Sequence, residues 1–339
     1  MTDQAPTDPA PRRSPSGDRH GRVRIGYSLS SEEQRPEDLV RFAQQAEASG
    51  FVYASISDHF HPWVDAQGNS PFVWTVLGAI ANATSSLEVG TGVTCPTVRY
   101  HPAIVAQAAA TVASLMPGRF FLGLGTGENL NEHITGDRWP AYEERAAMLE
   151  EAVDIIRRLW EGGTVDHRGE HFIVDNARLY TLPEAPPPII VAASGPKAAA
   201  LAGPIGDGLI NPMGDAEVVK AYEAVAGPGC PKYLQVSVCW NESEAEARRL
   251  AHRLVPSVGL PGELGNLLPT PTHYEQAVQL VTEDALAETI VCGPDPERHI
   301  AKIQSGIDAG YDRIHVYQVG PDQEGFFRFY ERHVLPAFA

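Results

Sequence analysis

The sequence predicts an α/β fold, a TIM (β/α)8 barrel with insertions, and three observations lead to that prediction. Eight short runs rich in β-branched and aromatic residues have the length of strands; they span residues 23–27, 53–56, 87–93, 120–123, 189–193, 208–210, 233–238 and 313–319. Helical patterns lie between these runs, which specifies parallel strands with helices outside. Polar and glycine-rich clusters follow several strands, at the end of the barrel where such folds carry their site.

The helical patterns are residues 36–48, 71–83, 101–115 and 141–160. The main alternative is a doubly wound open sheet, which places a glycine-rich turn after its first strand. Residues 26–30 contain one glycine, Gly26. The eight-unit barrel is therefore the better prediction.

The length and charge of the chain limit its class. We expect residues 23–339 to form one barrel domain and residues 1–22, rich in Pro, Asp, Arg and Ser, to form a disordered tail. Lys and Arg total 26 against 43 Asp and Glu, so the net charge of −17 disfavours nucleic acid and membrane surfaces as partners. Four cysteines without a close pair favour the reducing cytoplasm.

Two segments interrupt the alternation of strand and helix. Residues 162–180 contain two alternating runs around Gly169, which predicts a β-hairpin beside the barrel. Residues 255–272 are dense in Pro, Gly and Leu, which favours an irregular excursion. This excursion is either a lid that faces the substrate or a packed surface loop.

The segment SDHFHPW at residues 57–63 follows the second strand and carries the strongest chemical signal. His59 can act as a general base or a donor near neutral pH, and Asp58 cannot share its face of an extended segment. Trp63 offers a rigid apolar wall for a planar ligand. A loop imidazole bonded to a backbone carbonyl is the structural alternative for His59.

His59 and His61 also form an H-x-H pair of the kind that opens a metal site in barrel amidohydrolases. Such a site needs further ligands from later strands. Strands five and six end in the sequences ASG (193–195) and NP (211–212), which are poor ligands. We therefore predict no metal site.

The segment GLGTGENLNE at residues 123–132 follows the fourth strand and places Glu128 among glycines. A carboxyl group in a partly dry pocket can have its pKa raised toward the range useful for proton donation. The glycines can equally mark tight packing at the mouth of the barrel.

The segment SGPK at residues 194–197 follows the fifth strand and opens a helix. Free N–H groups, the Ser194 hydroxyl and the Lys197 cation make it a candidate anion site. Ser194 can equally be a plain helix N-cap. Lys197 in the first turn opposes the helix dipole, which favours a phosphate partner.

Four motifs together carry a family resemblance: SDHFHPW at 57–63, VGTGVTCPTVRYHPA at 89–103, FLGLGTGENLNE at 121–132 and VAASGPKAAA at 191–200. The sequence resembles the luciferase-like barrels of the bacterial luciferase superfamily. Within them it resembles the branch that uses the deazaflavin coenzyme F420 and includes F420-dependent glucose-6-phosphate dehydrogenases. The resemblance runs from residue 23 to the C-terminus.

The resemblance implies that His59, Trp63 and Glu128 surround the coenzyme carbon that exchanges hydride with the substrate, and that Glu32 is a further acidic residue of this pocket. It also implies coenzyme-binding positions: Asp58, a non-proline cis peptide between Gly92 and Val93 behind the ring, Thr126 and Gly127 in the GTGE segment, Asn131, and Ala193, Ser194, Gly195 and Lys197 at the phosphate tail.

One departure from the glucose-6-phosphate branch bears on the substrate. That branch binds the sugar phosphate with cations after strand six and in the late insertion. Here the first position is Asp215, and residues 254–297 contain no Lys or Arg. A phosphate buried against Asp215 would meet a like charge and lack charge-assisted hydrogen bonds. We therefore expect an uncharged, non-phosphorylated small-molecule substrate.

The resemblance thus predicts an F420-dependent oxidoreductase. Hydride passes between a secondary alcohol, or a sugar-like hydroxyl carbon, and C5 of the deazaflavin; the reverse carbonyl reduction is equally open. His59 takes the hydroxyl proton and Glu128 protonates ring nitrogen N1, although these two roles can be exchanged. An FMN-dependent monooxygenase and a non-catalytic deazaflavin-binding protein are the alternatives, and the resemblance suggests a homodimer.

Overall fold

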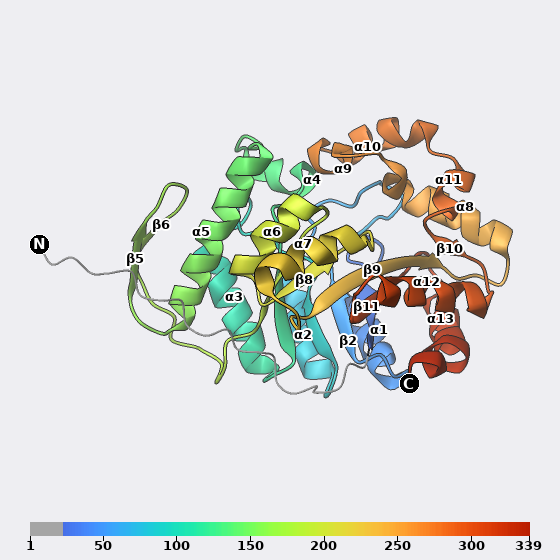
Figure 1. The fold of residues 1–339 in the computed structure, drawn as a ribbon, viewed down its shortest axis with the longest axis horizontal. Coiled ribbons are helices and arrows are strands. Elements are labelled where there is room, and N and C mark those ends of the chain that lie inside the picture. Colours follow the sequence, from blue (N-terminus) through green and yellow to red (C-terminus); the bar gives the residue numbers. More distant parts are fainter. Residues whose placement is uncertain (1–22) are drawn as a thin grey trace, which may run out of the picture.

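The computed structural model describes residues 23–339 and confirms the predicted barrel. Eight parallel strands pair in a closed ring, because β9 pairs with β8 and β11 pairs with both β9 and β1 (Figure 1). In ring order they are β1 (Arg24–Leu29), β2 (Tyr53–Ile56), β3 (Glu88–Thr91), β4 (Phe120–Leu124), β7 (Ile189–Ala192), β8 (Gly208–Asn211), β9 (Lys232–Cys239) and β11 (Arg313–Gln318).

Helices cover the outside of this ring. The four predicted helices begin within two residues of their expected starts, and prolines at the first positions of α1 and α3 explain why those two begin where they do. The helices around the barrel are α1 (Pro36–Ala48), α2 (Val73–Ala83), α3 (Pro102–Leu115), α5 (Tyr142–Trp160), α6 (Pro196–Ile205), α7 (Ala216–Ala226), α8 (Glu244–Leu254), α12 (Pro296–Asp308) and α13 (Gln323–Phe329).

The insertions agree with the prediction in one case and correct it in the other. The β-hairpin is present as antiparallel β5 (Val165–Arg168) and β6 (Ile173–Ala177). The prediction of an irregular excursion is wrong, because short helical turns form there: Pro256–Gly259 and α10 (Pro271–Ala277), which both begin with proline, and α9 (Leu264–Leu267). A two-residue strand, β10 (Val291–Cys292), was not predicted and pairs with the end of β9.

The predicted tail, residues 1–22, lies outside the described residues, so the division into tail and single domain stays a prediction. The third strand is shorter than expected. It ends at Thr91. The peptide bond between Gly92 and Val93 is cis, as the family resemblance implied. Within residues 23–339 no helix is long and apolar enough to span a bilayer.

Aromatic side chains fill the barrel interior and leave no room for a Cβ on two strand glycines. The rings of Tyr53, Phe121 and Tyr233 contact one another with centroids 5.1 to 6.4 Å apart. A Cβ on Gly90 would lie 2.2 Å from the Phe121 ring, and one on Gly26 would lie 2.5 Å from the Tyr53 ring. The interior is therefore a packed core, and only its carboxyl end is open to chemistry.

This packing predicts that Gly90→Ala lowers the free energy of unfolding by about 1 to 3 kcal/mol, because the added methyl group forces Phe121 to move. Chemical denaturation measures the change. The matched control is Gly78→Ala in α2, where nothing lies within 4 Å of the added Cβ and helix propensity favours alanine. Equal stability of Gly90→Ala and the wild type would contradict the packing argument.

Candidate active site

The structure brings four of the predicted residues together at the carboxyl ends of the strands. Glu32 follows β1, His59 and Trp63 follow β2, and Glu128 follows β4. The side chains of Glu32 and Glu128 lie on opposite sides of the His59 ring. Residues separated by nearly 100 positions in the sequence therefore form one cluster.

His59 is held in one orientation by acceptors on its Nδ1 side. Nδ1 lies 3.3 Å from Glu32 Oε1 and 3.2 Å from the His61 carbonyl oxygen, and both of these atoms accept hydrogen bonds. Nδ1 therefore carries the proton, and the lone pair of the neutral ring is on Nε2. The Nε2 atom lies 3.7 Å from Glu128 Oε2. This arrangement directs a base toward Glu128 and fixes the tautomer.

Glu32 is held just as firmly. Its Oε2 accepts hydrogen bonds from the hydroxyl groups of Ser30 (2.9 Å) and Ser57 (2.7 Å), and its side chain is 5% exposed. The neighbouring Glu33 points elsewhere and accepts from the Tyr317 hydroxyl and the Gly320 N–H. The β1 loop is thus tied to β2 and β11, which leaves Glu32 with its free oxygen toward His59.

Glu128 is more accessible, with 31% of its side chain exposed against 10% for His59. Asn131 donates from Nδ2 to Glu128 Oε2 at 3.1 Å. The Oδ1 atom of Asn131 accepts from the backbone N–H groups of Phe60 (2.9 Å) and His61. Asn131 therefore links the two loops that carry His59 and Glu128, and its predicted ring contact stays a prediction.

Trp63 forms a wall beside His59, with ring centroids 5.0 Å apart. On its other side it meets the ring of Tyr274 from α10 edge-on at 5.3 Å. Residues of the late insertion, among them Leu260 and Leu268, pack around this pair. The insertion therefore packs against the Trp63 side of the site, and the choice between a lid and a packed surface loop stays a prediction.

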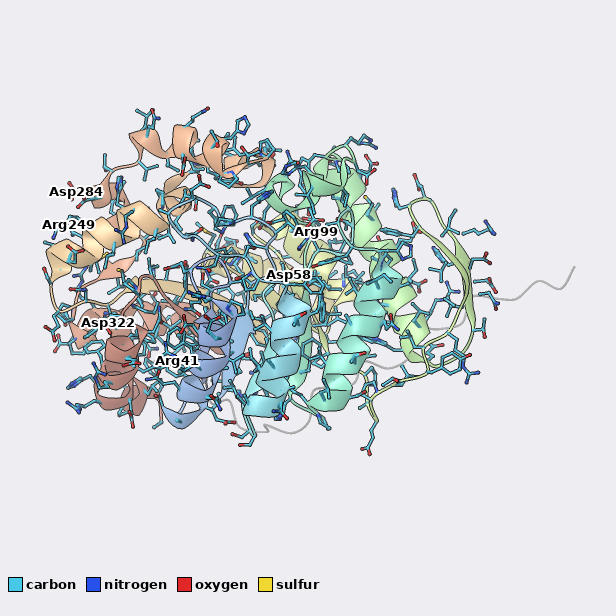
Figure 2. The ribbon with its side chains drawn as sticks, turned by 180° about the vertical axis from the view of Figure 1, so that it is seen from behind. Arg41, Asp58, Arg99, Arg249, Asp284 and Asp322 are labelled. Carbon is cyan, nitrogen blue, oxygen red and sulfur yellow. The ribbon has the colours of Figure 1, made fainter. Side chains whose placement is uncertain are left out.

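Asp58 is engaged within the protein on a different side from His59. Its carboxylate accepts from Thr94 Oγ1 at 2.7 Å and from Arg99 Nη2 at 3.0 Å. Arg99 also lies 3.6 Å from Glu132 Oε1, and all three charged side chains are buried. Figure 2 shows Arg99 next to Asp58. The predicted contact of Asp58 with the coenzyme stays a prediction.

Arg99 and Glu132 are site residues that the sequence analysis did not single out. Both lie inside the family motifs, but nothing in their spacing pairs them with Asp58. Burial raises the pKa of Glu132 to about 7, opposed by Arg99. Two buried carboxyl groups share one guanidinium, so the cluster favours a bound proton near neutral pH.

Small residues pack together at the carboxyl end of the barrel core. Val93 and Ala192 are only partly buried and pack against the aromatic interior. Gly92 and Gly125 lie against neighbours: added Cβ atoms would be 2.0 Å from Ser55 Oγ and 2.7 Å from the Val93 side chain. Only glycine fits at these two positions.

The GTGE segment depends on one further glycine. Gly127 has φ +80°, and a Cβ there would lie 2.5 Å from Cys95 Sγ. Thr126 and Gly127 are both half-buried beside Glu128. Only glycine can therefore stand directly before Glu128.

The start of α6 corrects one expectation and leaves one open. The N-cap residue is Gly195 and Ser194 is exposed, so the alternative that Ser194 caps the helix is wrong. Ala193 is buried and accepts from Asn211 Nδ2 at 2.7 Å. An added Cβ on Gly195 would meet nothing within 4 Å, and Lys197 pairs with Glu143 at 2.6 Å on the surface. The phosphate-tail assignment therefore stays a prediction.

The structure gives Asp215 a simpler role than the sequence suggested. Asp215 is exposed and caps α7, accepting from the Glu217 N–H at 2.8 Å. Water therefore screens its charge, and the premise of a phosphate buried against Asp215 is wrong. His61 is also placed away from His59: its Nδ1 lies 2.9 Å from the Leu130 carbonyl, and its ring stacks on His133. Among the described residues no three His, Cys, Asp or Glu side chains are grouped as metal ligands.

A histidine set between two carboxyl groups at the carboxyl ends of the strands is the arrangement of a barrel enzyme that moves protons. The chain belongs to the luciferase-like family, because the family model described as luciferase-like monooxygenase matches residues 22–313.

Two characterised relatives cover nearly the whole chain. The F420-dependent hydroxymycolic acid dehydrogenase of Mycobacterium tuberculosis is 39% identical over 92% of this chain and 87% of its own length. The F420-dependent glucose-6-phosphate dehydrogenase of Mycobacterium avium is 35% identical over 93% of this chain and 97% of its own length.

Solved structures agree with this placement. An F420-dependent secondary alcohol dehydrogenase, in complex with an F420–acetone adduct, superposes with a TM-score of 0.85 at 31% identity and covers 94% of this chain and 99% of its own. The coenzyme F420 dependent tetrahydromethanopterin reductase of Methanopyrus kandleri has a TM-score of 0.77 at 22% identity over 94% of this chain and all of its own, which supports the fold alone.

The buried cluster predicts how stability depends on pH. Because the folded state raises the pKa of Glu132 from 4.5 to about 7, its stabilising effect is complete below about pH 4.5 and is lost as the pH rises through 7. The free energy of unfolding of the wild type should therefore fall as the pH rises from 5 to 8. That of Glu132→Gln should fall by about 1 to 3 kcal/mol less over the same range.

Urea denaturation at four pH values from 5 to 8 measures this difference. Glu150→Gln on the exposed face of α5 is the matched control and should follow the wild type within about 0.5 kcal/mol. Parallel curves for wild type and Glu132→Gln would show that the carboxyl group of Glu132 is not perturbed.

Proposed function

We propose that this chain is a coenzyme F420-dependent oxidoreductase that acts on a CH–OH group, or on the corresponding carbonyl in the reverse direction. The observation that carries the proposal is the position of His59 between Glu32 and Glu128 and beside Trp63. Relatives with F420-dependent activity at 31 to 39% identity cover more than nine-tenths of the chain and support it.

The residues present fit the deazaflavin coenzyme. The partly buried Val93 and Ala192 offer an apolar surface for a flat ring, with Glu128 beside it. The open space at Gly195 and the free N–H groups at the start of α6 suit an anionic tail. Asp58, Thr126, Gly127, Asn131 and the segment from Ala193 to Lys197 would hold the coenzyme.

When bound, the coenzyme supplies the carbon that accepts or returns a hydride. His59 takes the hydroxyl proton at Nε2, because its Nδ1 proton is already directed at Glu32 and the His61 carbonyl. The resulting imidazolium is stabilised by Glu32 at 3.3 Å, as in other carboxylate–histidine pairs. In ketone reduction the same nitrogen returns the proton.

Glu128 is the second acid–base residue of the site. Asn131 donates to its Oε2 at 3.1 Å, and with the coenzyme bound Glu128 would supply the proton for the ring nitrogen. The 3.7 Å separation of Glu128 Oε2 from His59 Nε2 is short enough for the two residues to exchange roles. Trp63 holds the substrate against the ring.

The substrate is a non-phosphorylated secondary alcohol or its ketone. The late insertion, which forms one wall of the site through Tyr274, lacks the cations that a phosphate ester requires: residues 254–297 contain no Lys or Arg. The exposed position of Asp215 removes only the argument that a buried phosphate would be repelled by its carboxylate. The lack of Lys and Arg in residues 254–297 still argues against a phosphorylated substrate.

The assigned roles predict that His59→Ala slows coenzyme reduction by an alcohol by about 100-fold or more, since a general base contributes about 10² to 10⁴. Glu128→Gln should slow it by about tenfold or more. Stopped-flow absorbance of the oxidised coenzyme measures the rate, and His171→Ala on the β5–β6 hairpin loop is the control. If both variants keep the wild-type rate, the assignment fails.

The cofactor and substrate proposals predict a selective titration. Oxidised F420 should quench or shift fluorescence on binding at micromolar concentration, whereas FMN should not bind. Added glucose-6-phosphate should leave the visible band of F420 unbleached, and a secondary alcohol should bleach it. Tight FMN binding would favour the monooxygenase alternative. A non-catalytic binding protein would be favoured if F420 binds but no alcohol bleaches its oxidised form and no ketone restores the visible band of its reduced form.

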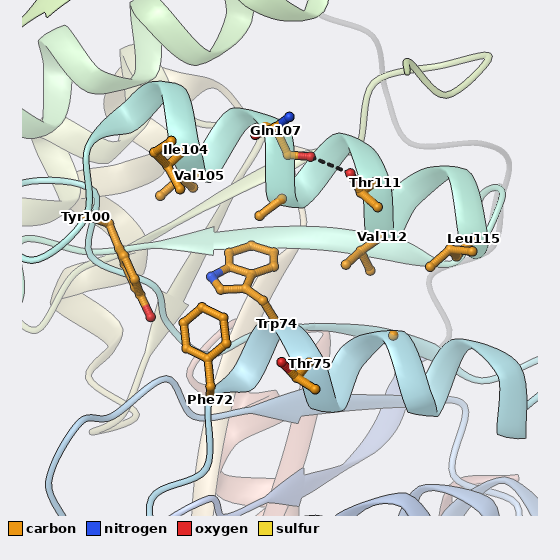
Figure 3. Close-up of a pocket in the computed structure, with 12 residues that line it drawn as sticks. Phe72, Trp74, Thr75, Tyr100, Ile104, Val105, Gln107, Thr111, Val112 and Leu115 are labelled. Carbon is orange, nitrogen blue, oxygen red and sulfur yellow. Dashed lines mark hydrogen bonds between the residues drawn. The ribbon is translucent and has the colours of Figure 1, made fainter. Parts of the chain in front are cut away.

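We further propose a cytoplasmic homodimer that pairs through α2 and α3. These helices contain no charged residue and enclose an apolar groove of about 420 Å³, with Phe72, Ile104 and Leu115 each more than half exposed (Figure 3). A second copy of a chain with net charge −17 meets least repulsion at an uncharged face. Four free cysteines fit the reducing cytoplasm.

The dimer proposal predicts that Ile104→Asp yields a monomer, because a carboxylate would be buried without a partner at the interface. Analytical ultracentrifugation at micromolar concentration measures the mass. The control is Leu280→Asp, which changes an even more exposed leucine, outside α2 and α3. A wild-type monomer, or loss of the dimer in both variants, would contradict the assignment of the interface.

A further inference from the structure

Two consecutive carboxyl groups after β1 have different partners. Glu32 faces His59, with its Oε1 atom 3.3 Å from the histidine Nδ1. Glu33 instead reaches the end of β11, where its Oε1 accepts from the Tyr317 hydroxyl and its Oε2 accepts from the Gly320 N–H at 2.9 Å. The acid next to Glu32 therefore joins the β1 loop to the last strand of the barrel.

The part of the barrel that Glu33 binds is itself fixed. Gln323, which is 2% exposed, donates from Nε2 to the Gly320 carbonyl at 2.7 Å and to the Gln318 carbonyl at 3.0 Å. The Oε1 atom of Gln323 accepts from the buried Tyr27 hydroxyl at 2.6 Å. Gly320 has φ +99°, a conformation that favours glycine. The N–H group that Glu33 meets is thus held in place by side chains of the barrel core.

The opposite side of the β1 loop is tied to the loop that follows β2. The backbone N–H of Asn69 donates to the Glu32 carbonyl at 3.0 Å, and its Nδ2 donates to the Glu33 carbonyl at 3.2 Å. Ser31 donates from its backbone N–H to Ser57 Oγ and from its hydroxyl to the Ser57 carbonyl. The loop is therefore held from two directions, and the Glu33 side chain supplies the bonds to β11.

The contacts of Glu33 do not require a negative charge. Burial raises the pKa of Glu33 to about 7, and the hydrogen bonds from Tyr317 and Gly320 oppose this rise. Near neutral pH the group is therefore partly protonated. A protonated carboxyl group can donate to the Tyr317 oxygen and still accept from the Gly320 N–H, and a glutamine side chain has an equivalent donor and acceptor.

We propose that Glu33 is a positioning residue, which binds Tyr317 and Gly320 and so holds the β1 loop with Glu32 facing His59. The effect on rate rests on the proposed function, whereas the geometry does not. A displacement of about 1 Å at a reacting group can cost about 10²-fold in rate. Because Glu33 points away from His59, its loss should lower the maximal rate and leave substrate affinity nearly unchanged.

The first test needs no coenzyme. In full-length protein labelled with ¹⁵N-histidine, the Nδ1–H signal of His59 should be protected from exchange with water, because acceptors cover that proton. His59→Ala identifies the signal by its loss. Tyr317→Phe and Glu33→Ala should shift the signal or lose it to exchange, since Glu32 is then held from one side alone. Tyr180→Phe, a change at an 86% exposed tyrosine, is the control and should leave the signal unchanged.

An unchanged His59 signal in both variants, in proteins whose circular dichroism shows them folded, would overturn the positioning role. A wild type without a protected signal would overturn it as well. Tyr317→Phe removes one hydroxyl group and keeps the ring, so it decides the question if Glu33→Ala does not fold.

The second test is stopped-flow reduction of F420 by a secondary alcohol. The maximal rate of Glu33→Ala should fall about tenfold or more, while the alcohol concentration that gives half this rate stays within about twofold. Glu33→Gln should recover most of the rate, because the amide replaces both contacts. Glu150→Ala on the exposed face of α5 is the control and should match the wild type.

A wild-type rate in Glu33→Ala, or a rate in Glu33→Gln as low as that of Glu33→Ala, would overturn the inference and leave the F420-dependent activity intact. If no alcohol reduces F420, the proposed function fails. The histidine signal alone then decides whether Glu33 positions Glu32.

Discussion

The orientation of the His59 imidazole is the constraint on which the rest of the site depends. Glu32 and the His61 carbonyl both accept hydrogen bonds, so they fix the proton on Nδ1 and leave Nε2 as the basic atom. Ser30 and Ser57 hold Glu32 in turn, which means that three loops contribute to the direction of one lone pair. This lone pair lies on the side of the ring that faces Glu128.

A second layer keeps those loops in register. Asn131 accepts from the β2 loop with one end and donates to Glu128 with the other, so the separation of base and acid is set by a single amide. The buried side chains of Asp58 and Glu132 both pair with Arg99, in place of water. Such a buried network costs desolvation free energy, and its use here is to fix geometry rather than to add stability.

The distribution of charge gives the molecule distinct surfaces. Helices α2 and α3 carry no charged residue, and the late insertion carries no Lys or Arg. An uncharged helical face suits association between like-charged copies, and an insertion without cations suits an uncharged substrate. Both properties follow from the lack of charged residues on α2 and α3 and of cations on the insertion.

The sequence by itself determined the barrel, since strand and helix periodicity depends on local side-chain patterning. It predicted His59, Trp63 and Glu128 as site residues from motifs that follow strands, and Glu32 from the family resemblance. It misjudged the 255–272 insertion, because one-turn helices started by Pro and Thr leave almost no periodic signal. It also missed Arg99 and Glu132, whose burial with Asp58 exists only once distant loops meet. Tertiary structure alone decided the tautomer of His59, the exposure of Asp215 and the contact of the insertion with Trp63 and Asn129, because distances between residues far apart in the chain are set by packing and not by local sequence.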